Sequence, residues 1–262
     1  MQDKIIQKAG ELLSGGDVKV VIGYGRGTGD RVHAVFIQKP EDAGALVMDA
    51  RCLQNLAVYL PKQEVKALGK PAIVARTPVM RAIKQLMYEE QFREGDITVI
   101  GISDDGQVLD FPDLKSMNEY IDKIPLALSP EEAAAVAKLD AMTREERWKF
   151  WMEETSACIK CYACRASCPM CYCPRCTVEC NQPQWISVPA HELGNLEWHI
   201  MRAMHLAGRC VNCGDCYRNC PLKIPLNLLT QRIIADIGDN FGQEADYVLA
   251  AFKPEDKEDF IR

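Results

Sequence analysis

The chain carries the stretch Cys158-Ile-Lys-Cys161-Tyr-Ala-Cys164-Arg-Ala-Ser-Cys168-Pro169 and, further on, the stretch Cys210-Val-Asn-Cys213-Gly-Asp-Cys216-Tyr-Arg-Asn-Cys220-Pro221. Both follow the spacing C-x2-C-x2-C-x3-C-P, in which cysteine thiolates hold clusters of four irons and four sulfides. Three cysteines two residues apart curl the backbone around one such cube, while the turn carries the fourth to the neighbouring cube. The two runs therefore predict two 4Fe–4S cubes in the second half of the chain.

The spacing also assigns each cysteine to a cube. One cube takes Cys158, Cys161, Cys164 and Cys220, and the other takes Cys210, Cys213, Cys216 and Cys168. A zinc site would need only paired CxxC units, so two complete runs, each ending in Cys-Pro, favour iron over zinc.

Four further cysteines lie between the two runs and do not follow the same spacing: Cys171, Cys173, Cys176 and Cys180. They could ligate a third 4Fe–4S cluster or a zinc ion, or they could remain reduced thiols that pack beside the cubes. Because exposed free thiols next to redox iron would be oxidised readily, we favour metal ligation, with a cluster ahead of zinc.

Cysteine usage and charge divide the chain in the same way. Twelve of the 13 cysteines lie between Cys158 and Cys220, and the first 157 residues contain only Cys52. Since the cytosol keeps thiols reduced, such a group is more typical of metal binding than of disulfides. Residues 155–225 carry seven Lys and Arg against four Asp and Glu, although the whole chain has a net charge of −6. The overall acidity argues against a nucleic-acid partner, and the local cations suit negatively charged thiolate clusters.

No segment of the sequence marks the chain for a membrane or for export. No apolar run approaches the roughly 20 residues that a membrane-spanning helix needs, and no signal-peptide core follows Met1. We therefore expect a cytoplasmic protein without a membrane span.

The first 125 residues read as alternating strands and helices. The clearest unit passes from a strand at Pro71–Ala75 through a helix at Pro78–Tyr88 to a strand at Ile97–Gly101, which is a βαβ crossover. It predicts a parallel or mixed sheet covered by helices. The remaining expected elements are strands at Val18–Ile22, Val32–Ile37 and Ala45–Met48 and helices at Ile5–Leu13 and Arg51–Leu60.

A polar connector is expected from Gly101 to about Pro130, and two helix starts follow it. Ser129-Pro-Glu-Glu132 and Thr143-Arg-Glu-Glu146 each combine an N-cap hydroxyl with a glutamate at the third helical position. The fold class is thus α+β. It comprises an N-terminal α/β domain over 1–125, a helical linker over 126–157, and a ferredoxin-like double 4Fe–4S domain with flanking helices over 158–262.

Several short motifs also resemble known families. Those of the first domain are Gly23-Tyr24, Asp49 to Cys52 with Asn55-Leu56, Lys70 to Val74 with Arg81-Ala82, and Ile100-Gly101. This set resembles the N-terminal domain of the beta subunits of deazaflavin-linked hydrogenases and formate dehydrogenases. Those of the second domain are Cys168 to Cys173, Gln182 to Trp185, Arg202 to Cys210, and Ile224 to Leu226. This set is similar to the dicluster iron–sulfur subunits that accompany heterodisulfide-reductase-type flavoprotein complexes.

The resemblance implies a subunit of an anaerobic, multi-subunit oxidoreductase. Such subunits pass electrons between a hydrogenase or formate dehydrogenase and a flavin-based, often electron-bifurcating, core of the heterodisulfide-reductase type. Where related sequences place a Cys-Asp pair, this chain has Thr77-Pro-Val-Met80. This departure argues against flavin binding by the first domain.

Three functions follow from these patterns. The first is an iron–sulfur relay without catalytic residues, because no set of acid, base or nucleophile stands out in the sequence. The second is a flavin-containing beta subunit that itself oxidises a deazaflavin or nicotinamide cofactor, which flavin absorbance would reveal. The third is a structural or regulatory module whose clusters no partner reduces.

Overall fold

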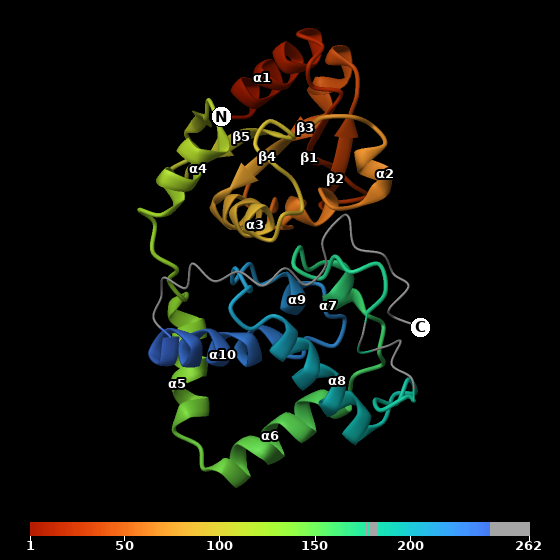
Figure 1. The fold of residues 1–262 in the computed structure, drawn as a ribbon, viewed down its shortest axis with the longest axis vertical. Helices are drawn as coiled ribbons and strands as arrows, with labels where there is room; N and C mark the ends of the chain where they lie inside the picture. Colours follow the sequence, from red (N-terminus) through yellow and green to blue (C-terminus); the bar gives the residue numbers. More distant parts are fainter. Residues whose placement is uncertain (177, 179–182, 242–262) are drawn as a thin grey trace. The chain divides into compact units, whose positions relative to one another are not determined.

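The computed structural model describes residues 1–176, 178 and 183–241. It divides the chain into two compact units, Met1–Pro125 and Leu126–Arg262, here called the first and second unit. The first unit is built on a mixed sheet, and the described elements of the second unit are helices (Figure 1). Within the described ranges, no helix has the length and apolar character needed to cross a membrane.

A mixed sheet forms the centre of the first unit. Its strands are β1 (Val20–Arg26), β2 (Val32–Ile37), β3 (Leu46–Val47), β4 (Pro71–Arg76), β5 (Thr98–Ile102) and β6 (Val108–Asp110). The order is β2-β1-β4-β5-β6, with β3 paired to β1. Strands β1, β4 and β5 are parallel, whereas β2, β3 and β6 run antiparallel to their partners. The predicted βαβ crossover is confirmed, with α3 (Thr77–Tyr88) joining β4 to β5.

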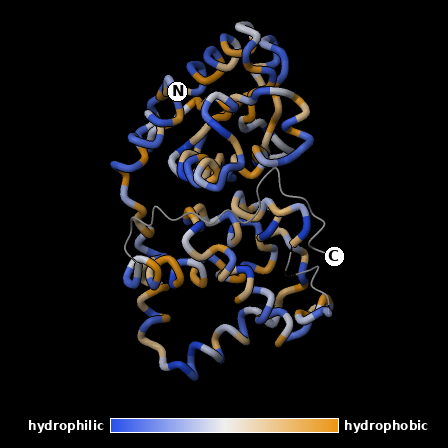
Figure 2. Tube along the Cα trace, in the orientation of Figure 1, coloured by the Kyte–Doolittle hydropathy of each residue, from blue (hydrophilic) through white to orange (hydrophobic). Residues whose placement is uncertain are grey.

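Helices cover this sheet on both faces. They are α1 (Gln2–Ser14), α2 (Gln63–Lys66), α3 and α4 (Leu114–Ile121), together with the 3-10 segments η1 (Pro40–Ala45) and η2 (Leu56–Tyr59). In β4 the consecutive residues 72–75 are all buried, as expected of a strand with both faces covered. Hydrophobic positions lie in the strands and on the helices of the first unit (Figure 2). The core of the first unit is thus mainly apolar.

Two expectations for the first unit were wrong. In place of a helix over Arg51–Leu60, only η2 is helical, because the buried Asn55 side chain accepts from the Ala57 amide and donates to Pro78 O at 3.0 Å. The supposed connector after Gly101 contains β6 and α4. The Asp113 carboxylate caps α4 by accepting the amide of Ser116 at 2.7 Å.

The second unit is an assembly of helices. They are α5 (Pro130–Asp140), α6 (Arg144–Ser156), α7 (Ala163–Ala166), α8 (Glu192–His205), α9 (Asp215–Arg218) and α10 (Leu226–Phe241). Both predicted capping boxes, at Ser129 and Thr143, are confirmed. Helix α8 packs on α6 and α10, and the short helices α7 and α9 lie side by side (Figure 1). The two cysteine runs are therefore carried by neighbouring, matching elements.

Candidate metal centre

The two cysteine runs adopt the same backbone conformation. Lys160 and Asn212, each two residues after the first cysteine, both have positive φ, at 50° and 51°. Tyr162 and Gly214, two residues further on, are also left-handed, at 58° and 75°, and they start α7 and α9. A left-handed conformation costs a residue with a side chain roughly 1–2 kcal/mol. Because Lys160 and Asn212 both bear this cost at the same position of their runs, the loop shape recurs with the cysteine spacing.

This backbone shape aims amides at the cysteine sulfurs. The amide of Lys160 donates to Cys158 Sγ at 3.3 Å. Burial raises the pKa of the Cys210 thiol, whereas the backbone amide of Asn212 lowers it, so the second run repeats the contact. Alternating left-handed and right-handed residues form concave nests of N–H groups, a device that many iron–sulfur sites use to bind anions. Each loop is thus shaped to surround a negatively charged group.

The structure brings the thiols of the first predicted cube together. Burial raises the pKa of Cys158, and the charges of Cys161 and Cys220 raise it further. Burial also raises the pKa of Cys164 to about 11, with added contributions from Cys158 and Cys161. Cys164 and Cys220 share one buried cluster, against which Cys158 packs. Cys220 of the second run therefore lies near Cys158 and Cys164 of the first, and their assignment to one cube stays a prediction.

The second predicted cube has two thiols that could complete it. Burial raises the pKa of both Cys213 and Cys216 to about 12, and the charge of Cys210 acts on each. Cys168, the predicted fourth ligand, shares a side-chain hydrogen bond with Cys171, which raises the pKa of Cys171 further than burial alone. The charge of Cys171 also raises the pKa of Cys210. The sequence assigns Cys168 to this cube and Cys171 to the set between the runs, and in the structure the two thiols lie side by side.

The described side chains do not form a site for a single metal ion. Among the described side chains, no group of three or more His, Cys, Asp or Glu lies close enough to hold one metal ion. The thiolates of a cube bind four different irons, so a cube spreads its ligands more widely than a single ion does. Buried thiols that lie close together suit a cationic metal group, which binds them as thiolates. Ligation would release their protons.

The cysteines between the runs are placed only in part. The charges of Cys171 and Cys176 raise the pKa of Cys173, although burial is the largest cause. Cys176 also packs on the buried cluster that contains Cys164 and Cys220. Cys180 lies outside the described residues. A third site therefore stays a prediction.

Arginines brace the loops through their carbonyl groups. Arg202 donates to Cys164 O at 2.9 Å, and Arg218 donates to Cys213 O at 2.5 Å. Arg218 also pairs with the buried Asp215 at 2.7 Å. The first two contacts fix the carbonyl groups of two candidate ligands, so an arginine holds the backbone of each run.

Helix α8 anchors the start of the first run through Asn195, which sequence reasoning missed. Its side-chain nitrogen lies 2.8 Å from Cys158 O, 3.2 Å from Thr155 O and 3.3 Å from Ser156 O. The last carbonyls of a helix have no partner within the helix. Asn195 therefore satisfies the C-terminal end of α6 and fixes Cys158 at the same time.

Replacing Asn195 by leucine should lower the free energy of unfolding of the second unit by about 1–3 kcal/mol, because buried carbonyls lose their donor. Asn195→Asp should cost at least as much, since it sets carboxylate oxygens against carbonyl oxygens. Met201→Ala, on the exposed side of α8, should stay within about 0.5 kcal/mol. Anaerobic denaturant unfolding followed by tryptophan fluorescence measures these effects. Wild-type stability in Asn195→Asp would contradict the anchoring role.

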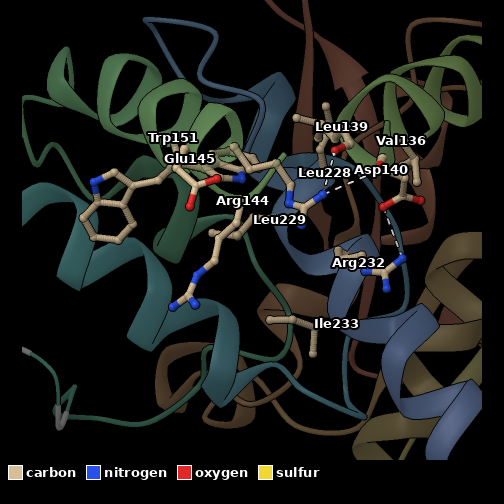
Figure 3. A pocket seen from close by; sticks show the side chains of 12 residues that line it. Val136, Leu139, Asp140, Arg144, Glu145, Trp151, Leu228, Leu229, Arg232 and Ile233 are labelled. Carbon is tan, nitrogen blue, oxygen red and sulfur yellow. Dashed lines mark hydrogen bonds and ion pairs between the residues drawn. The ribbon is translucent and has the colours of Figure 1, made fainter. Parts of the chain in front are cut away.

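A groove that contains no cysteine lies elsewhere in the second unit, between α5, α6 and α10 (Figure 3). It has a volume of about 940 Å³, and apolar side chains such as Leu139, Leu228 and Ile233 line it. Arg232 and Asp140, which also line it, pair at 3.2 Å. The groove is therefore distinct from the cysteine loops.

Comparison with known proteins finds a partial relative. No protein-family model matches the chain. Over 99 residues the chain is 35% identical to the F420-dependent formate dehydrogenase subunit beta of Methanocaldococcus jannaschii, a stretch that covers 37% of this chain and 24% of that protein. The match thus spans about a quarter of the relative's length, and it supports a relationship to such beta subunits over part of the chain.

Proposed function

We propose that this protein is an electron-relay subunit of an anaerobic, multi-subunit oxidoreductase. In this proposal residues 158–262 form a ferredoxin-like domain with two 4Fe–4S cubes, preceded by a helical linker over 126–157. The ligands of one cube are Cys158, Cys161, Cys164 and Cys220, and those of the other are Cys210, Cys213, Cys216 and Cys168. Cys171, Cys173, Cys176 and Cys180 would hold a third cluster or a zinc ion.

The observation that carries the proposal is the repeated loop. Two runs of identical spacing have left-handed residues at the same two positions, and each is followed by a four-residue helix. If the clusters only braced the fold, burial of their thiols would be enough, and amides aimed at the sulfurs would not be needed. Nests of amides around the sulfurs also stabilise negative charge, which is what an electron-accepting cluster needs.

The residues of the chain would act on bound cubes by holding and shielding them. When bound, the clusters supply reversible one-electron transfer. Lys160 and Asn212 direct amides at the sulfurs, and Arg202 and Arg218 fix the carbonyls of the loops. Burial of Cys164 and Cys220 keeps water from part of the site. Solvent access, hydrogen bonds and nearby charge are the levers that set the potential of such clusters.

The partners follow from the relative and from the resemblance of the motifs. The matched relative is a formate dehydrogenase subunit, which supports a formate dehydrogenase or a hydrogenase on one side of the relay. The motifs of the second half favour a flavoprotein of the heterodisulfide-reductase type on the other side. The first unit would serve this assembly by docking to a partner.

An electron-flow assay tests the proposal. The isolated chain, purified without oxygen, should reduce no dye from formate, hydrogen, reduced deazaflavin or reduced nicotinamide. It should restore electron flow when added to a complex that lacks it. Dye reduction by the isolated, flavin-free chain would overturn the relay in favour of an enzyme. Clusters that no partner can reduce would overturn it in favour of a structural module.

A further inference from the structure

Arg202 is a buried cation in the last turn of α8. Only 5% of its surface is exposed, and its Nη2 donates to Cys164 O at 2.9 Å. Among the described residues no carboxylate pairs with it, and its Nε has no hydrogen-bond partner. A buried charge costs several kcal/mol unless an opposite charge compensates it. Arg202 therefore needs an anion at this position.

The groups that would supply negative charge to Arg202, once ligation removes their protons, are cysteines of both runs. Burial would lower its pKa, but the charges of Cys171, Cys168, Cys164 and Cys216 raise it above the usual value. Cys164 and Cys168 belong to the first run, and Cys216 belongs to the second. One guanidinium thus acts on thiols that the relay proposal assigns to two different cubes.

The neighbouring imidazole, that of His199, adds no second positive charge beside Arg202. His199 lies one helical turn before Arg202 and is 3% exposed. Burial lowers its pKa to about 4, and the charges of Arg202 and Lys160 add to the effect. His199 is therefore neutral at pH 7. The positive charge on this face of α8 resides on Arg202.

We propose that Arg202 is the shared counter-charge of the two cubes and raises the reduction potential of both. The inference rests on the proposed relay and deepens it. Each cube gains one electron from an external reductant and so one negative charge, with no bond made or broken. A fixed buried cation stabilises the reduced cube more than the oxidised one, because the attraction grows with the charge of the cube. A cation common to both cubes therefore shifts both potentials in the same direction.

Redox titration of the anaerobic holoprotein, followed by electron paramagnetic resonance, tests the inference. Arg202→Gln removes the charge but keeps an amide donor for Cys164 O, whereas Arg202→Met removes both. In each variant the equilibrium constant for one-electron reduction of both cubes should fall at least tenfold, a shift of about 59 mV to lower potential. Arg202→Lys should recover most of the shift. Lys149→Met, which removes an exposed cation from α6, should leave both potentials unchanged.

Three outcomes would overturn the inference. They are unchanged potentials in an Arg202→Gln protein with full iron content, a shift confined to one cube, and an equal shift in Arg202→Lys and Arg202→Gln. If Arg202→Met does not assemble, Arg202→Gln and Arg202→Lys decide the matter. A wild-type protein without two reducible centres would instead overturn the proposed relay itself.

Discussion

Replacing Cys213 by serine is expected to lower the iron content from about eight to about four irons per chain and to remove or alter one of two paramagnetic centres. Cys213 is the second of the four cysteines of the second run, and burial raises its pKa to about 12 while the Asp215 amide lowers it. A serine hydroxyl at this buried position is a poor substitute for a thiolate that binds iron. The cube held by the first run should persist, but electron flow through the complex should stop.

Cys52 provides the matched control for this substitution. It is the one cysteine outside the region between Cys158 and Cys220, and it is fully buried in the first unit. Its thiol donates weakly to Val47 O at 3.8 Å, a contact that a serine hydroxyl can replace. Cys52→Ser should therefore keep about eight irons. A Cys213→Ser protein with full iron and two unaltered signals would contradict the ligand assignment.

Removing iron with a chelator should unfold the second unit and leave the first unit folded. The first unit has a continuous apolar core around its sheet. In the second unit, one buried cluster around the loops has six residues, two of which are the candidate ligands Cys164 and Cys220. Where ligands are part of the core, metal binding supplies folding free energy. The apoprotein should therefore be cut by protease after about residue 126 while residues 1–125 resist.

Tryptophan fluorescence gives an independent measure of the same change. All four tryptophans, Trp148, Trp151, Trp185 and Trp198, belong to the second unit. Trp198 is buried beside Cys164 and Cys220, so its emission should shift to longer wavelength when iron is removed. Simultaneous loss of protection over the whole chain would show that the units are not independent. Retained protection of residues 126–241 without iron would show that the clusters are not part of the core.

The fold of the first unit was predictable where the spacing of hydrophobic residues changes from that of a strand to that of a helix. The apolar run of β4, followed by the helical pattern of α3, identified the crossover from sequence. The helix expected over Arg51–Leu60 failed because the buried Asn55 side chain satisfies backbone groups that a helix would have paired. The hairpin of β5 and β6 had a signal, Asp105-Gly106, in which Gly106 takes a positive φ of 84°.

The candidate site also has a part that the sequence predicts and a part that only the structure shows. Cysteine spacing names the thiols, because local spacing decides which of them one loop can bring together. The left-handed conformations of Lys160 and Tyr162 have no sequence signal, since neither residue is a glycine. Asn195 and Arg202 fall seven residues apart on one face of α8, but only tertiary packing shows that this polar pair is buried. Sequence therefore names candidate ligands and misses the groups that position and charge-balance them.

The most direct test of the account is the count of iron, acid-labile sulfide and zinc in the anaerobically purified chain, with spin quantification of the reduced protein. Two cubes predict about eight irons and eight sulfides per chain with two reducible centres, and a third cluster would raise the count to about twelve of each. Fewer than about four irons together with stoichiometric zinc would contradict the account, because the paired runs would then be zinc sites with no electron to carry.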